Sequence, residues 1–199
     1  MLGSHGLFTW GETAYECYIN TLQVIEKCAA YIENNIQLQP AVFSGQKIEP
    51  LSENERRKQA AALAPIVRGC CSSNQNMVGH FTDDSRVLEF INSNDLEKLA
   101  PMGTSCPDHF LRTKISPLVL PLSASANLGD THSIQQQLLP SFEAYRAMYA
   151  NYYSTHQHAD SPAMRDPNPV VVLVPGVGDR KSTRLNSSHS SVSRMPSSA

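Results

Sequence analysis

The sequence predicts a layered α/β fold, on three observations. Residues 170–174, Val-Val-Val-Leu-Val, form a continuous apolar run typical of a strand buried on both faces of a sheet. Residues 118–120, Leu-Val-Leu, indicate a shorter strand between prolines. Segments with apolar residues at helical spacing precede and separate these strands. Such alternation of helices and strands favours layers of helix packed on a sheet.

The first predicted helix covers residues 13–34. Thr13 and Glu16 have the spacing of a capping box, in which each side chain satisfies a free backbone N–H at the helix start. Apolar residues then recur at steps of three and four and give the helix one apolar face. This face contains Tyr18, Leu22, Ile25, Cys28, Ala29 and Ile32.

Four further helices follow. Ser52 and Glu55 form a second capping box, and Pro65 should kink or divide the helix that they begin. Asp83 and Asp84 suit a helix cap better than a metal site, and Asn94 or Asp95 begins the next helix. The last helix carries a stripe that we interpret as core rather than as a platform for stacking bases: Leu138, Phe142, Tyr145, Tyr149, Tyr152 and Tyr153. His156 and His158 follow it as solvated imidazoles.

Composition indicates a soluble, cytoplasmic globular protein. The chain has 199 residues, of which 41% are hydrophobic and 17% charged. It has no apolar stretch near the roughly 20 residues of a membrane span and no signal peptide at its start. The cysteines are odd in number and form no CxxC pair, which favours a reducing compartment. They are Cys17, Cys28, Cys70, Cys71 and Cys106.

Residues 179–199 differ from the rest of the chain. They contain eight serines in 21 positions, and their back-translation fits a short-read sequencing adapter. We interpret them as an assembly artefact and expect them to be disordered; the alternative is a natural serine-rich tail. Without their four basic residues and one acidic residue, the chain keeps 12 basic and 17 acidic residues, a net charge of −5. That balance argues against a nucleic-acid partner.

The strongest chemical motif is the opening Ser4-His5-Gly6-Leu-Phe-Thr-Trp-Gly11, followed by the first helix. A histidine at a strand end, next to a glycine, can project into a cleft where the backbone approaches a ligand. On chemistry alone, a lone histidine is more often structural than a metal ligand. Family resemblance reverses this preference.

The motif resembles the His-Gly segment of the class II aldolase/adducin family. The resemblance implies a three-layer α/β/α fold, incomplete at the N-terminus here, and makes His5 a ligand of a catalytic Zn²⁺. In this family two more histidines come from an upstream His-x-His pair, often with a glutamate as general base. Those residues would precede Met1, so the catalytic residues are unknown, and we expect this fragment to be inactive alone.

Three more segments resemble one subgroup, the bifunctional rhamnulose-1-phosphate aldolase/short-chain dehydrogenase proteins. They begin at Ser52, Gly103 and Asp160. The resemblance implies retro-aldol cleavage of a sugar phosphate, rhamnulose 1-phosphate, to dihydroxyacetone phosphate and lactaldehyde. It also implies a homo-oligomeric parent and a downstream NAD-dependent domain that this chain lacks. Residues 1–36 would then belong to the metal-site unit, and residues 37–178 to a helical and α/β extension.

Two other segments are weaker candidates for a functional site. In Cys106-Pro-Asp-His109-Phe-Leu-Arg112-Thr-Lys114, Asp108 could orient His109, while Arg112 and Lys114 could meet a phosphate. A proline-bounded loop with solvated cations explains the same residues equally well. Residues 175–178, Pro-Gly-Val-Gly, lack the third glycine and the helix of a dinucleotide-binding loop.

Two other functions remain open on this sequence. One is a non-catalytic adducin-like scaffold with the same fold, and the other is a sugar-phosphate epimerase. An upstream His-x-His pair would favour the enzyme, and its lack would favour the scaffold.

Overall fold

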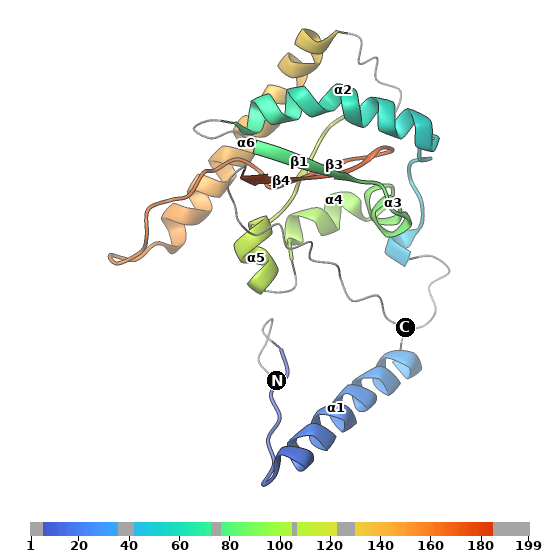
Figure 1. The fold of residues 1–199 in the computed structure, drawn as a ribbon, viewed down its shortest axis with the longest axis vertical. Coiled ribbons are helices and arrows are strands. Elements are labelled where there is room, and N and C mark those ends of the chain that lie inside the picture. Colours follow the sequence, from blue (N-terminus) through green and yellow to red (C-terminus); the bar gives the residue numbers. More distant parts are fainter. Residues whose placement is uncertain (1–5, 36–41, 73–76, 105–106, 123–129, 185–199) are drawn as a thin grey trace.

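The computed structural model describes residues 6–35, 42–72, 77–104, 107–122 and 130–184. Figure 1 shows helices on both sides of a small sheet, with the first helix apart from the other elements. The helices are α1 (Ala14–Asn35), α2 (Glu53–Cys71), α3 (Ser85–Ile91), α4 (Leu96–Leu99), α5 (Pro107–Thr113) and α6 (Thr131–His156). Two 3₁₀ turns, η1 (Val42–Ser44) and η2 (Ala100–Met102), join them. The strands are β1 (Met77–Thr82), β2 (Leu118–Val119), β3 (Val171–Val174) and β4 (Gly178–Arg184).

The four strands form one mixed sheet with the order β1-β4-β3-β2. β4 pairs antiparallel with both β1 and β3, whereas β2 and β3 run parallel. The long α6 connects the two parallel strands, as a parallel pair requires a crossover. The predicted strands at 118–120 and 170–174 are therefore confirmed as β2 and β3.

Two apolar cores lie on opposite faces of the sheet. The larger core joins α2 and α6 to one face, with Phe142, Leu138 and Val67 among its fully buried side chains. The smaller core joins α3 and α4 to the other face through Ile91, Leu96 and Leu173. Because β3 is covered on both faces, its side chains are apolar at successive positions. The described elements from α2 to β4 thus form three layers, and the predicted α/β fold is confirmed.

The predicted helix starts are accurate where a side chain caps the helix. Asp84 Oδ1 accepts a hydrogen bond from Val87 N at 2.9 Å and begins α3, which confirms a cap rather than a metal site. Ser52 caps α2, and Pro65 lies inside that helix without dividing it. Asp83 instead forms an ion pair with Arg56 at 3.0 Å, which ties α2 to the end of β1.

The last predicted stripe is partly core. Leu138, Phe142 and Tyr145 of α6 are buried, and the Tyr145 hydroxyl donates to Ser116 O at 2.8 Å. Burial raises the pKa of Tyr145, since the phenolate would lose its hydration. Further along, Tyr152 is half-buried and stacks on the exposed His156 ring at the helix end.

The apolar face of α1 has no cover among the described residues. The helix has nearly the predicted bounds, but none of its residues is buried. Tyr18, Leu22 and Ile25 expose 60%, 44% and 53% of their surface. No helix in the described ranges is long and apolar enough to cross a membrane.

The expectation of disorder from residue 179 onward is wrong for residues 179–184. These residues form most of β4, which lies inside the sheet and pairs along both edges. The physical reason is that strand pairing uses backbone N–H and C=O groups, so neighbouring strands can impose an extended conformation on a polar sequence. Residues 185–199 lie outside the described residues.

The sequence analysis did not predict β1. Its sequence, Met-Val-Gly-His-Phe-Thr, places a glycine and a histidine in a short run and so weakens the apolar signal of a strand. The segment at 107–113, considered as a loop, is the short helix α5.

Candidate functional site

The segment that follows His5 is fixed to the first turns of α1. Thr9 Oγ1 lies 2.6 Å from Thr21 Oγ1, and Asn20 Nδ2 donates to Trp10 O at 2.8 Å. The capping box is confirmed, because Thr13 Oγ1 accepts from Glu16 N while Glu16 Oε2 accepts from Thr13 N. Residues 9–13 are thus held by side chains rather than by a sheet.

Gly11 permits the close turn between this segment and α1. A Cβ atom at this position would lie 2.7 Å from the backbone nitrogen of Cys17, which is too short for any side chain. The glycine is therefore required by close packing. His5 itself lies outside the described residues, so its role as a metal ligand stays a prediction.

The structure does not gather His109, Arg112 and Lys114 into one site. His109 and Arg112 lie on α5 with exposed side chains. Lys114 follows the helix, is half-buried and has φ of 64°, in the left-handed region that few non-glycine residues adopt.

Lys114 turns toward the interior of the molecule. Its ammonium group donates to the carbonyl oxygens of Asp166 and Asn168, and its Nζ lies 4.4 Å from the centre of the Tyr149 ring. Asn168 also accepts from Arg146 at 3.0 Å and donates to Cys71 O at 3.2 Å. Lys114 therefore joins the chain after α5 to the segment that leads into β3, and this geometry does not present it to a phosphate.

The glycine pair at 176 and 178 belongs to the turn between β3 and β4. Val177 N donates to Val174 O at 3.0 Å, and Gly176 has φ of 81°. An antiparallel strand follows, rather than the helix whose N-terminus would bind a phosphate. This topology supports the interpretation from sequence that residues 175–178 are a poor match to a dinucleotide-binding loop.

A pocket of about 310 Å³ lies where the two parallel strands end. Val119 ends β2, Leu120 and Leu122 follow it, and Pro175 directly follows β3. Ile48 and Leu96 complete the apolar wall. In open α/β sheets, the crevice at the carboxyl ends of parallel strands is the common place for ligands. The sequence analysis did not identify this pocket, because its residues carry no chemical motif.

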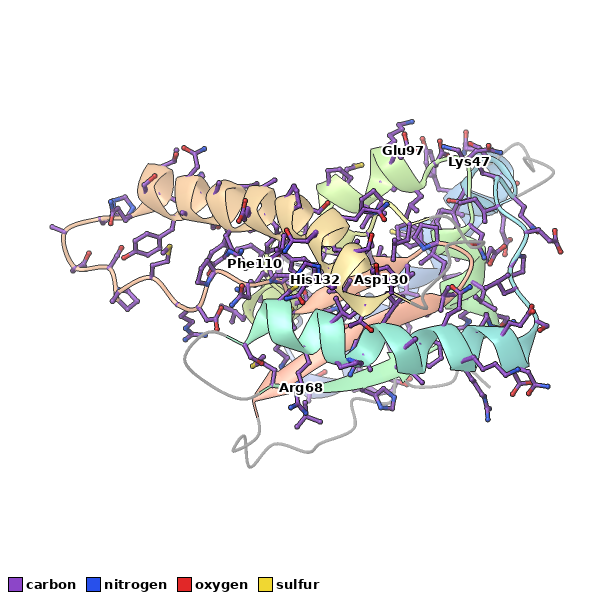
Figure 2. The ribbon with its side chains drawn as sticks, turned by 90° about the horizontal axis from the view of Figure 1, so that it is seen from above. Lys47, Arg68, Glu97, Phe110, Asp130 and His132 are labelled. Carbon is purple, nitrogen blue, oxygen red and sulfur yellow. The ribbon has the colours of Figure 1, made fainter. Side chains whose placement is uncertain are left out.

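The polar groups of the pocket are Lys47, Glu97 and Ser93. Lys47 Nζ lies 2.8 Å from Glu97 Oε1, and Figure 2 shows the two side chains next to each other, away from Arg68 on α2. The hydrogen bond and the charge of Lys47 lower the pKa of Glu97. Ser93 is buried and donates through Oγ to Phe90 O at 2.8 Å.

The described residues do not provide a metal site. In those ranges no group of three or more histidine, cysteine, aspartate or glutamate side chains is close enough to hold an ion. A catalytic zinc needs about three protein ligands. Burial raises the pKa of the Cys71 thiol to about 12, so the free thiol is protonated at neutral pH. A zinc site with three ligands would therefore need at least one donor from outside these ranges.

Comparisons with known proteins identify the family of this chain and one relative. The family model described as "Aldolase class II, second domain" matches residues 58–193. A Bacillus subtilis (strain 168) protein, named "Uncharacterized oxidoreductase YuxG", is 33% identical over 178 residues, which are 89% of this chain. The chain spans only 25% of that relative's length. No solved structure matches the chain.

Proposed function

Because the chain belongs to the class II aldolase family through its second domain, we propose that it is part of a zinc-dependent sugar-phosphate aldolase. The reaction is retro-aldol cleavage of rhamnulose 1-phosphate to dihydroxyacetone phosphate and lactaldehyde. The observation that supports the proposal is that two separate parts of the chain indicate the same family. The family model matches residues 58–193, and the His5-Gly6 motif lies near the N-terminus.

The anchored segment after His5 supports this proposal. Hydrogen bonds from Thr9 and Asn20 fix residues 9–10 on α1, and Gly11 allows the tight connection. A ligand needs such support, because a metal site depends on holding each donor in a narrow range of positions. His5 would contribute one donor, and the remaining donors would come from elsewhere in the parent enzyme.

We also propose that the parent protein is bifunctional and carries an NAD-dependent dehydrogenase domain, and the B. subtilis relative supports this. That relative is named an oxidoreductase, and the matched region is a quarter of its length. A parent protein of that size has room for an NAD-dependent dehydrogenase domain besides the aldolase region. His109 and Arg112, both exposed on α5, remain candidates for contact with the substrate phosphate.

The test uses the longer reading frame from the same source, resequenced at both ends and expressed as a full-length protein. Zinc content and cleavage of rhamnulose 1-phosphate would be measured for the unaltered protein, for His5→Ala and for His132→Ala, an exposed histidine on α6. We expect His5→Ala to lose bound zinc and at least a hundredfold in activity, and His132→Ala to lose neither. Full zinc and full activity in His5→Ala would contradict the proposal.

The alternative that the sequence leaves open is a non-catalytic adducin-like scaffold with the same fold. The same full-length protein distinguishes the two. A folded protein that binds no zinc and cleaves no sugar phosphate would support the scaffold.

A further inference from the structure

We propose that the apolar face of α1 is an interaction surface, and that the part of the parent protein that precedes residue 1 covers it. The proposal rests on that part of the proposed function which makes this chain a segment of a longer protein. It does not rest on the aldolase reaction or on His5.

The two sides of α1 differ in a regular way. The apolar residues along the middle of one side follow one another at steps of four, three, four and three, and all of them are exposed: Tyr18, Leu22, Ile25, Ala29 and Ile32. The opposite side is polar and carries Glu16, Asn20, Gln23, Lys27 and Asn34. Helices with such a stripe bury it against another element, so α1 has the sequence of a helix with one covered side.

Exposed apolar side chains are concentrated in this part of the molecule. Among the described residues, eight of the thirteen large hydrophobic side chains that are exposed lie between residues 8 and 32: Phe8, Trp10, Tyr15, Tyr18, Leu22, Ile25, Tyr31 and Ile32. Hydrogen bonds from Thr9 and Asn20 already hold the preceding segment on the helix. A concentration of this kind on a preformed unit marks an interaction surface.

The family match indicates what covers this surface. The matching model describes a second domain and begins at residue 58, after the end of α1. A second domain implies a first, and α1 lies on the first domain's side of that boundary, apart from the sheet (Figure 1). The B. subtilis match covers 89% of this chain, so it includes at least the second half of α1, yet it is only 25% of the relative's length. Such a relative has room for a first domain before the matched region.

Charge argues against a second copy of α1 as the cover. Glu26 and Glu33 lie along one edge of the apolar face, and each directly follows an isoleucine of that face. In an antiparallel pair of α1 helices these edges would meet and place glutamate opposite glutamate. In a parallel pair they would meet the other edge, with Thr21 and Cys28, which offers no cation. We therefore expect the covering surface to place a lysine or arginine beside these glutamates.

Cys28 provides the test, because it lies at an edge of the apolar face and is exposed. Iodoacetamide would be applied under native conditions to the 199-residue protein and to the full-length parent, with alkylation followed by peptide mass spectrometry. We expect Cys28 to react at least about tenfold more slowly in the full-length protein. Cys71 is buried in the larger core and should stay protected in both proteins, which shows that the second domain is folded.

Lys27→Cys, made together with Cys28→Ser, is the matched control. Lys27 is the neighbouring residue but lies on the polar side of α1, so the introduced thiol should react equally fast in both proteins. Equal alkylation of Cys28 in the two proteins would overturn the proposal, as would equal protection at positions 27 and 28. Protection of Cys28 that grows with the concentration of the 199-residue protein would assign the face to a second copy instead.

The interface and the aldolase reaction can fail separately. A full-length protein that protects Cys28 but cleaves no rhamnulose 1-phosphate would support the interface and contradict the reaction. One that cleaves the sugar phosphate while Cys28 stays fully reactive would support the reaction and contradict the interface.

Discussion

Lys114 shows how one residue can have a role other than the one its sequence neighbours indicate. Beside Arg112 and His109 it resembles part of a phosphate site. In the structure it holds the carbonyl oxygens of Asp166 and Asn168, 52 and 54 residues further along the chain. Spacing along α5 carries no information about such distant acceptors, so this role could not be predicted from the sequence.

We expect Lys114→Met to destabilise the protein by about 1–3 kcal/mol. Methionine keeps the apolar stem but leaves the two carbonyl oxygens without their charged donor. Urea unfolding followed by circular dichroism measures the effect. Lys98→Met, at an exposed lysine, should change the free energy of unfolding by less than about 0.5 kcal/mol. Equal stability of Lys114→Met and the unaltered protein would refute the structural role.

At the scale of elements, short sequence patterns predicted those features that neighbouring residues determine, such as helix starts. The caps at Ser52 and Asp84 were predicted because a capping side chain lies within three residues of its partner. The strand at Val171–Val174 was predicted because both faces are apolar. Burial of the α1 face was not settled by its periodicity, since an apolar stripe indicates a helix but not the surface that covers it.

β4 shows a conflict between sequence and position. Asp179 lies opposite Leu173 and Thr82, on the face that α3 covers, and its Oδ1 has no hydrogen-bond partner among the described residues. The Arg180 side chain extends over Gly79, where a Cβ atom would overlap its guanidinium group. A central strand covered on both faces ordinarily carries apolar residues at such positions. That residues 179–199 come from a sequencing adapter stays a prediction. An adapter-derived segment would not be selected for its place in the sheet, so charged residues at these two positions fit that prediction.

We expect Asp179→Val to stabilise the protein at neutral pH by on the order of 1 kcal/mol. Burial raises the pKa of Asp179, and the hydrogen bond with Thr82 only partly opposes this. The folded state therefore holds the proton more tightly than the unfolded chain. Its contribution to stability falls as pH rises from the ordinary carboxyl value of about 3.9 through the raised value.

Urea unfolding between about pH 3 and pH 7, an interval that begins below the ordinary carboxyl pKa, measures this contribution. The difference between Asp179→Val and the unaltered protein should grow as pH rises. Asp160→Val, at an exposed aspartate, should show no such growth. A difference that shrinks toward neutral pH would contradict the raised pKa.

At the scale of the whole molecule, the layers and the family were accessible from sequence, and the order of strands was not. Helices alternating with apolar runs predicted the α/β class, and the motifs around His5 predicted the family to which the second domain belongs. Sheet order depends on pairing between residues far apart, such as Phe81 with Arg180. The pocket depends in turn on that order, because β2 and β3 must be neighbours for their ends to meet.

The central claim is that this chain supplies one metal ligand, His5, to a site whose other ligands lie elsewhere. The most direct test is equilibrium dialysis of the purified 199-residue protein against zinc, with metal analysis and an assay for cleavage of rhamnulose 1-phosphate. We predict less than one tightly bound zinc per chain and no cleavage. One tightly bound zinc per chain, lost in His5→Ala together with measurable turnover, would contradict the claim.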